Sequence, residues 1–322
     1  MSSRASSRLA FALLACYAVW GSTYLAIRVA LPSFPPFFQM GTRFLAAGAL
    51  LMGWVAWRRR QGSSGAPGWP TARQWMHALV IGFLMLGLGM GLTATASVHI
   101  GSGLVAAFIA VVPMMICGWG LLWGRRPSRA ETAGMLLGFG GVVLLVQGAS
   151  FSASPASIAC IAAATAAWSL GSVLSTTRLP LAPGASGYAS EMLCGGVVLM
   201  AISVALGERP QWPPQPAAVA AWLYLVVLGS LVAFSAYMYL LAHASPALAS
   251  SYAFVNPLIA LLLGSVLAAE PVTRGEWIAC AVILLAVLII LAARPRKQAT
   301  DPRPCEIDST KAAPAMKNGA AP

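Results

Sequence analysis

Charged residues are scarce in this chain: Asp, Glu, Lys and Arg make up only 9% of its 322 residues, against about 25% in a typical soluble domain. No aspartate precedes Asp301, and the lysines all lie at or beyond Lys297. So few charges cannot give a soluble protein of this size a water-facing surface, whereas 59% apolar residues can supply membrane-spanning helices. The composition excludes a soluble domain and indicates an all-α integral membrane protein.

Sequence motifs for ATP, metal and redox chemistry are missing as well. The chain has no GxxxxGK[ST] phosphate-binding loop and no HExxH zinc motif. Five of the six cysteines lie inside apolar runs and none forms a CxxC pair, so neither a disulfide framework nor a zinc site is expected. The net charge of +12 comes from small basic clusters between apolar runs, which is not the pattern of a nucleic-acid surface. We expect no cofactor, no metal and no nucleic-acid partner.

A series of long apolar runs dominates the chain instead. A spanning helix needs about 20 mostly apolar residues, and runs of this kind begin after residues 1–8, the expected cytoplasmic N-terminus. Residues 298–322 are rich in Pro, Ala and scattered charge and predict a disordered cytoplasmic tail. The ten expected transmembrane helices cover residues 9–30, 34–56, 75–97, 101–122, 131–149, 156–177, 186–206, 217–241, 247–268 and 275–293.

The basic residues indicate how the helices are oriented. If the N-terminus is inside, 16 Lys and Arg residues fall in cytoplasmic segments, and Arg28, Arg209 and Arg274 fall outside. Cytoplasmic segments of membrane proteins are enriched in Lys and Arg. This bias predicts a multi-pass protein with both termini in the cytoplasm.

The two halves of the chain resemble each other weakly. At an offset of 144 residues Pro113 matches Pro257, one of six identities over 29 ungapped positions. The WGS of residues 20–22 also recurs, in a spaced form, from Trp168 onward. Two repeats of five helices enter the membrane in opposite senses because five is odd, and such inverted repeats are typical of alternating-access transporters. The predicted repeats are residues 9–149 and 156–293.

Three strings of residues resemble one family of bacterial inner-membrane proteins. They are WGSTY at 20–24, RFLAAG at 43–48 and SPALASSYAFVNP at 245–257. As a set they resemble the EamA-type drug/metabolite transporters. The resemblance implies two EamA repeats around a central cavity, and export of small metabolites, amino acids or drugs across the inner membrane. One position departs from the family: Gly124 is followed by Arg125, where the family commonly has Glu.

Glu191 is the only carboxylate well inside an expected span, because Glu131 and Glu276 are the first and second residues of theirs. An ionisable group in a span costs about 2.5–3.5 kcal/mol to insert, which makes Glu191 a functional candidate. Burial favours the protonated carboxyl, which suits coupling of export to proton influx. If the helix begins near Ser186, however, Glu191 lies only about 7 Å from the cytoplasmic boundary. A structural carboxylate reached by water is therefore the alternative interpretation.

Arg43 lies deeper, about 13 Å into its helix when counted from Phe34. At that depth its side chain should face a cavity or pair with an acceptor. One hypothesis is that it binds a substrate carboxylate, because a guanidinium matches that group with two parallel hydrogen bonds. The alternative is that helix carbonyls, water or Glu191 satisfy it.

Aromatic and polar side chains on the first, sixth and ninth helices complete the expected substrate site. Such groups offer stacking and cation–π contacts to an aromatic or amine-bearing solute. The alternative for the tryptophans is packing against lipid. Besides Arg43, the candidate substrate-binding residues are Trp20, Thr23, Tyr24, Trp168, Ser172 and Asn256.

Two prolines are expected in the middle of equivalent helices, Pro113 in the fourth and Pro257 in the ninth. Proline removes a helix hydrogen bond and can kink the helix. The two residues are therefore candidates for a gate or hinge, with simple tolerated kinks as the alternative.

The sequence as a whole favours a secondary active transporter, not an enzyme, that exports small molecules by alternating access, with proton coupling through Glu191 as a hypothesis. A passive facilitator of the same fold and a membrane-embedded transferase are the alternatives. The expected partners are a small-molecule substrate and the lipid bilayer, and the protein is expected to work as a monomer or a homodimer.

Overall fold

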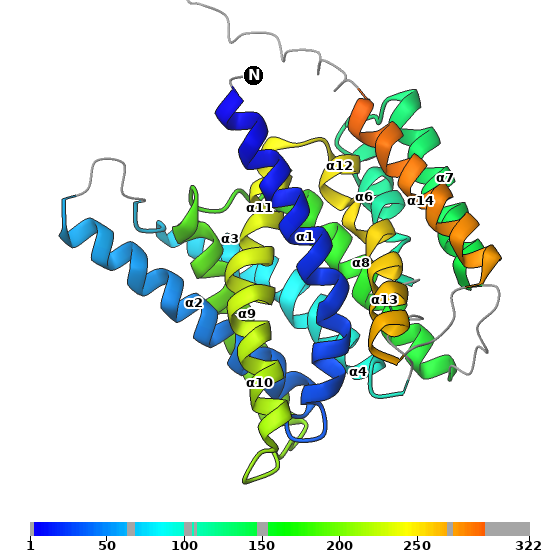
Figure 1. Ribbon diagram of the computed structural model, residues 1–322. Coiled ribbons are helices and arrows are strands. Elements are labelled where there is room, and N and C mark those ends of the chain that lie inside the picture. The colour runs from blue at the N-terminus through cyan, green and yellow to red at the C-terminus, as the bar shows by residue number, and fades with distance from the viewer. Residues whose placement is uncertain are drawn as a thin grey trace, which may run out of the picture.

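The fold is built from helices only in the part of the chain that the structure describes. This computed structural model describes residues 3–62, 68–99, 105, 108–146, 154–268 and 273–293. The all-α class is confirmed (Figure 1). The elements in chain order are α1 (Ser3–Ala30), α2 (Pro36–Arg60), α3 (Ala72–Gly82), η1 (Phe83–Met90), α4 (Gly91–Ala96), α6 (Val112–Leu121), α7 (Arg129–Val146), α8 (Pro155–Thr177), α9 (Ala185–Ala205), α10 (Pro216–Tyr224), η2 (Leu225–Phe234), α11 (Ser235–His243), α12 (Pro246–Ser250), α13 (Tyr252–Ala268) and α14 (Arg274–Ala292).

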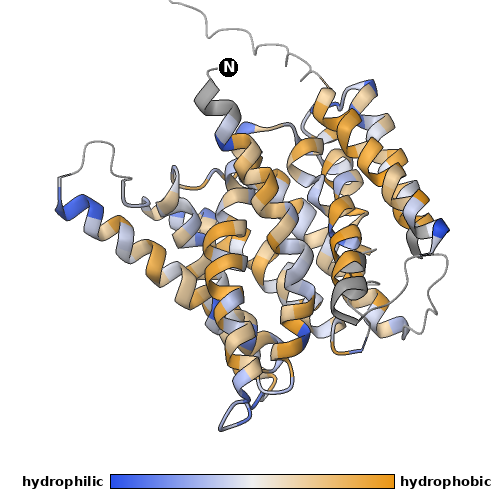
Figure 2. Cartoon of the chain, in the orientation of Figure 1, coloured by the Kyte–Doolittle hydropathy of each residue, from blue (hydrophilic) through white to orange (hydrophobic). Residues whose placement is uncertain are grey.

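Several of these helices have the length and the apolar character of membrane spans. Each of the expected ranges overlaps at least one helix, and hydrophilic residues gather at helix ends rather than along the helices (Figure 2). Two further helices, Val112–Leu121 and Trp277–Ala292, are apolar but shorter. In the described part of the chain, the five that are long and apolar enough to cross a membrane are Ser7–Ala30, Ala72–Ala96, Pro155–Thr177, Ala185–Ala205 and Pro216–His243.

Two of these spans contain π-helical segments, which periodicity alone does not predict. The span from α3 to α4 contains η1, and the span from α10 to α11 contains η2. Shifting residues 83–90 by the repeat offset of 144 gives 227–234, which lies within η2. π-Helices are rare and are often found at functional sites. Their placement at equivalent positions supports the internal repeat.

The two halves of the chain pack against each other in a reciprocal way. In the first half α1 packs against η2 and α13, and in the second half α8 packs against η1 and α6. The second helices, α2 and α9, pair along their length, and so do the fifth helices, α7 and α14. The elements that α1 contacts in the second repeat are thus equivalent to those that α8 contacts in the first repeat. A two-fold relation between the repeats requires this pattern.

Small residues allow α2 and α9 to approach closely. A Cβ atom added to Gly48 would lie 3.0 Å from the backbone nitrogen of Leu193, and one added to Gly196 would lie 2.9 Å from that of Leu45. Close backbone approach through small residues is the usual way that helices associate where lipid removes the hydrophobic driving force. This packing sets the positions of the two helices, α2 with Arg43 and α9 with Glu191, relative to each other.

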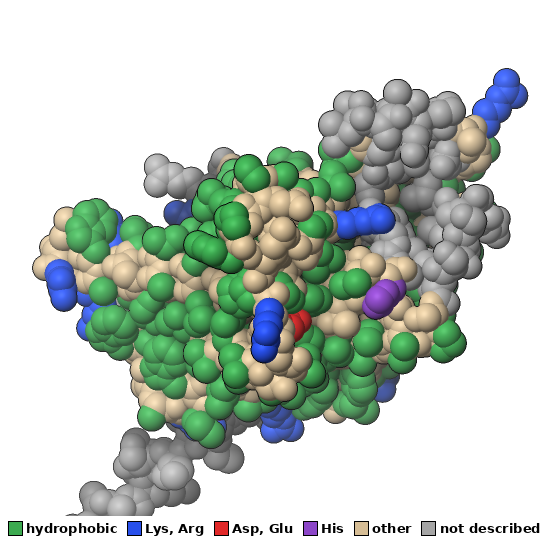
Figure 3. Space-filling model, turned by 90° about the horizontal axis from the view of Figure 1, so that it is seen from below, with side chains coloured by type: hydrophobic (Ala, Val, Ile, Leu, Met, Phe, Trp, Pro, Cys, Tyr) green, Lys and Arg blue, Asp and Glu red, His purple; other side chains and the backbone are tan. Residues whose placement is uncertain are grey.

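Hydrogen bonds join the two repeats at the end of the molecule where α2 begins. The Glu208 carboxylate accepts from the backbone N–H groups of Phe37 (3.2 Å) and Phe38 (2.7 Å). The backbone oxygen of Ser33 accepts from Gln211, and its hydroxyl accepts from Gln215. The α1–α2 and α9–α10 connections are thereby tied together. Seen from this end, hydrophobic side chains share the surface with backbone and uncharged polar groups and with a few Lys or Arg side chains (Figure 3).

Candidate functional site

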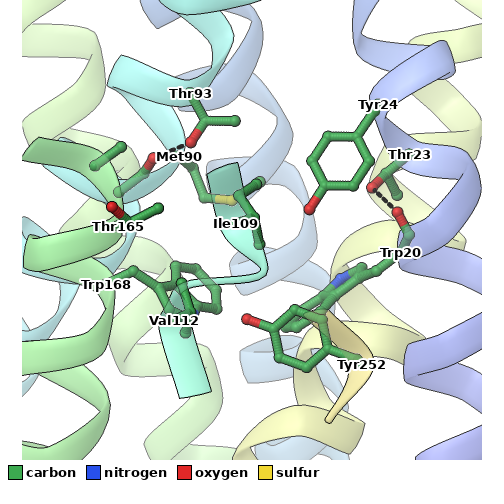
Figure 4. Close-up of a pocket in the computed structure, with 12 residues that line it drawn as sticks. Trp20, Thr23, Tyr24, Met90, Thr93, Ile109, Val112, Thr165, Trp168 and Tyr252 are labelled. Atoms are coloured by element: carbon green, nitrogen blue, oxygen red, sulfur yellow. Dashed lines mark hydrogen bonds between the residues drawn. The ribbon is translucent and has the colours of Figure 1, made fainter. Parts of the chain in front are cut away.

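A cavity lies between helices of the two repeats, with α1 on one side and α8 on the other (Figure 4). Its volume is about 40 Å³, enough for a few water molecules. The residues lining it in the described part of the chain are all uncharged. Four of the predicted substrate-binding residues are among them, namely Trp20, Thr23, Tyr24 and Trp168.

Helical spacing gives the side chains of each of these two helices a common face toward the cavity. Trp20, Thr23 and Tyr24 are three and four residues apart on α1 and therefore share a face, and Thr165 and Trp168 have the same spacing on α8. The Thr23 hydroxyl donates to the Trp20 carbonyl oxygen at 2.8 Å. The Thr165 hydroxyl likewise donates within its own helix. The threonines thus add small polar surface to the cavity without burying an unpaired donor.

Three aromatic rings that line the cavity, those of Trp20, Trp168 and Tyr252, pack against a fourth, that of Tyr237. We call these four residues the aromatic cluster. The Trp20 ring lies 4.7 Å from Tyr252, 5.0 Å from Tyr237 and 5.6 Å from Trp168 between centroids. These separations lie in the range in which aromatic pairs attract each other. Because the rings come from α1, α8, α11 and α13, the cluster joins both repeats.

Hydrogen bonds orient two members of the aromatic cluster, Trp20 and Tyr237. The Trp20 indole N–H donates to the carbonyl oxygen of Gly229 in η2 at 3.3 Å. The predicted site residue Ser172 does not line the cavity in the described structure, but its hydroxyl is 2.8 Å from the Tyr237 hydroxyl. Ser172 therefore lies behind the cluster and holds Tyr237.

Asn256 likewise lies behind the cavity wall. Its side-chain amide donates to the Tyr24 hydroxyl at 3.2 Å, and it is fully buried. The Asn256 side-chain oxygen has no hydrogen-bond partner among the described residues. Asn256 thus positions Tyr24, whose ring extends toward the opposite wall in Figure 4.

Arg43 is almost completely buried, with 1% of its surface exposed. Its Nε–H donates to the Ser230 hydroxyl at 2.7 Å, and its guanidinium carbon lies 4.8 Å from the centre of the Phe44 ring. A Cβ atom added to Gly229 would lie 2.8 Å from Arg43 Nη2 and 3.4 Å from Thr23 Cγ2. The guanidinium therefore lies next to Thr23, just behind the cavity wall.

Glu191 is fully buried on α9, and neither of its carboxylate oxygens has a hydrogen-bond partner among the described residues. The proposed pairing of Arg43 with Glu191 is therefore absent from this part of the structure. The physical reason is the register of the α2–α9 interface: Leu45 meets Gly196 and Gly48 meets Leu193, so Arg43 lies more than a helical turn away from Glu191.

The two prolines differ in position. Pro257 lies inside α13, as expected. Pro113 is not in the middle of a helix: it lies in the first turn of α6, after a turn at residues 110–111. Proline fits the first turn because the N–H that it lacks has no helical partner there.

Comparison with known proteins identifies the family. A model of the EamA-like transporter family matches residues 7–147 and again residues 155–292. The chain belongs to the EamA-like transporter family. The predicted resemblance is thereby confirmed, and both halves of this EamA-like protein contain an EamA repeat.

Several proteins resemble this EamA-like chain over most of its length. It is 38% identical over 280 residues to the uncharacterized inner membrane transporter YedA of Escherichia coli K12, covering 87% of this chain and 89% of YedA. It is 26% identical over 285 residues to protein PecM of Dickeya dadantii, covering 84% and 88% of the two chains. A chloroplastic WAT1-related protein of Arabidopsis thaliana is 26% identical over 291 residues, covering 86% of this chain and 68% of the plant protein. Family and relatives make this protein a membrane transporter.

A crystal structure of another protein shares the fold. The two match with a TM-score of 0.70 at 22% sequence identity, covering 88% of this chain and 96% of the other. At this identity the match concerns the fold alone.

Some site residues of this EamA-like protein were not predicted from the sequence. Tyr237 and Tyr252 complete the aromatic cluster, and Thr93 and Thr165 line the cavity. The repeat offset of 144 relates two of them, Tyr237 and Thr93, to each other, but it relates neither to a predicted residue and so was no signal by itself. Ser230 had no signal either, since only the fold places it beside Arg43.

Proposed function

We propose that this EamA-like protein is a secondary active transporter that exports small metabolites, amino acids or drugs across the inner membrane by alternating access. The observation that carries the proposal is the cavity between the repeats, which polar and aromatic side chains of α1 and α8 line. Its 40 Å³ is far smaller than the volume that a drug-sized ligand needs. Binding therefore requires the repeats to move apart, as they do in alternating access.

The proposed topology has ten transmembrane helices in two inverted five-helix repeats, with both termini in the cytoplasm. The reciprocal packing of α1 and α8 supports the two-fold relation between the repeats. The concentration of 16 Lys and Arg residues in the segments assigned to the cytoplasm supports the orientation.

In this mechanism the substrate contacts Trp20, Thr23, Tyr24 and Trp168 directly. Ser172 and Asn256 hold two tyrosines of the site, and Pro113 and Pro257 are the proposed gate or hinge positions. Arg43, next to Thr23, becomes accessible when the cavity widens and then binds a carboxylate of the substrate.

Glu191 is the proposed proton carrier. A buried carboxylate without hydrogen-bond donors is far more stable protonated than charged. When α9 moves and water reaches Glu191, the carboxyl can release its proton. Each cycle would thereby exchange a proton for the exported solute.

Transport measurements test this proposal. A growth-rescue screen of overproducing cells against toxic amino acid analogues and drugs identifies an exported solute, whose uptake is then measured in inside-out vesicles. An acidic vesicle lumen should raise uptake severalfold in the wild type, and E191Q should abolish this dependence. The matched variant E131Q should retain the dependence on the pH of the lumen, because a Gln side chain can also accept the hydrogen bond that the Ser128 backbone N–H donates to Glu131.

Two results would contradict the proposal. Wild-type uptake that does not respond to the pH gradient would identify a passive facilitator. A gradient response that survives E191Q would remove Glu191 from coupling, while leaving export intact.

A further inference from the structure

Two connections between helices cap helix ends of the opposite repeat. In the α9–α10 connection, the Glu208 carboxylate accepts from the backbone N–H groups of Phe37 and Phe38 in the first turn of α2. In the α6–α7 connection, Arg125 donates to Thr176 in the last turn of α8, from Nη2 to the backbone oxygen at 2.8 Å and from Nη1 to the hydroxyl at 3.0 Å. We call these two contacts the α2 latch and the α8 latch.

Each latch supplies a charge that the capped helix lacks. The first turn of α2 has no acidic residue, and no side chain of its N-cap residue caps it. The last turn of α8 has no basic residue, and its C-cap residue, Arg178, is exposed. A negative charge stabilises a helix N-terminus and a positive charge stabilises a C-terminus. Both helices therefore receive from the other repeat the charge that stabilises these ends.

The two latches lie at opposite ends of the molecule (Figure 1). The helix α9 begins a short connection after α8 ends and runs to Ala205, just before Glu208. Its 21 residues span about 31 Å. Each latch joins a residue of the first EamA match, 7–147, to a residue of the second, 155–292. The latches therefore tie the same two repeats together at both ends.

Both latches hold helices that lie next to the cavity. Trp168, which lines the cavity, precedes Thr176 on α8 by about 12 Å. At the other latch the Phe37 ring packs against α4, because a Cβ atom added to Gly91 would lie 2.6 Å from Phe37 Cε1. Gly91 directly follows Met90, which also lines the cavity. Opening either latch would therefore loosen one wall of the cavity.

We propose that the two latches open alternately and thereby decide from which side of the membrane the cavity is reached. Both are closed in this structure. They share no residue, so one can break while the other holds. Glu208 and Arg125 are only partly buried, so water can replace the lost hydrogen bonds when a latch opens. The inference rests on the proposed alternating access, but its test needs no transported solute.

Cysteine labelling of the full-length protein tests this inference. The reporter T93C lies in the cavity wall, in a background without the six native cysteines, and a membrane-impermeant maleimide is added to spheroplasts or to inside-out vesicles. E208A should raise the labelling rate about tenfold from one side of the membrane, and R125A should raise it about tenfold from the opposite side, because losing hydrogen bonds to a charged group shifts the equilibrium toward the open state. The matched variants R209A and R126A change the exposed neighbours and should label like the parent.

Three results would overturn the inference. These are labelling rates that neither E208A nor R125A changes, rates that both variants raise from the same side, and rates that either variant raises equally from both sides. The proposed topology assigns the periplasmic side to E208A, so opposite effects with the two sides exchanged would contradict that topology and leave the latches in place.

A covalent lock covers the case in which a variant misfolds. Beside the α2 latch the backbone N–H of Gln211 donates to the backbone oxygen of Ser33 at 2.8 Å, so the two chains are close enough for a disulfide in S33C/Q211C. Oxidation of this pair should lower the labelling of T93C at least about tenfold from one side of the membrane only, and reduction should restore it. Labelling that oxidation leaves unchanged from both sides would also overturn the inference.

Discussion

Arg43 and Glu191 are two buried ionisable side chains that have no ion-pair partner in the described part of the structure. Arg43 donates to the neutral Ser230 hydroxyl, which leaves its charge uncompensated. A buried charge without a counter-ion costs free energy unless a ligand supplies one. An anionic group of a substrate in the neighbouring cavity could supply this counter-ion.

Replacing Arg43 with alanine should weaken transport of anionic and zwitterionic solutes by about 10- to 100-fold and of cationic solutes far less, because a charge-assisted hydrogen bond contributes about 1.5–3 kcal/mol. Transport assays with paired solutes of similar size measure the difference. The control S230A removes only the hydroxyl that Arg43 contacts and keeps the charge. An equal loss for all solutes in R43A would assign Arg43 to folding instead.

At the scale of elements, a carboxylate from the second repeat caps a helix of the first. Gly207 has a φ of 67°, a left-handed conformation that glycine adopts readily, and it ends α9 so that Glu208 can turn toward α2. Glu208 then accepts from two N–H groups in the first turn of α2. Anions at a helix N-terminus are stabilising because unpaired N–H groups and the macrodipole meet there.

The variant E208A should lower the free energy of unfolding by about 1 kcal/mol, the usual cost of losing a helix cap. The midpoint of thermal unfolding in detergent measures this effect. R209A, which changes the exposed neighbour of Glu208, should leave the midpoint nearly unchanged. Equal midpoints for E208A and the wild type would show that the contact contributes nothing to stability.

At the scale of the whole molecule, the proposed orientation rests on the distribution of basic residues. A reporter enzyme that is active only outside the cytoplasm should be active when inserted after Trp212 and inactive when inserted after Gln61. Activity assays of the two fusions test this, because the topology places the two connections on opposite faces of the membrane. Activity at both positions, or at neither, would contradict the inverted arrangement of the repeats.

The sequence by itself determined that this protein is an all-helical membrane protein and pointed to two EamA repeats. Membrane insertion depends on long apolar runs, and family membership shows in short strings such as residues 20–24, so both can be recognised along the chain. Trp20, Thr23 and Tyr24 were predicted together as aromatic and polar side chains of the first helix, and helical spacing does put them on one face.

Only the tertiary structure decided which distant side chains meet. Tyr237 joins Trp20 and Trp168, while Arg43 contacts Ser230 rather than Glu191. The register of closely packed helices determines these pairings. That register depends on how glycines and side chains of segments far apart in the chain fit together in space, which the order of residues along a single helix does not contain.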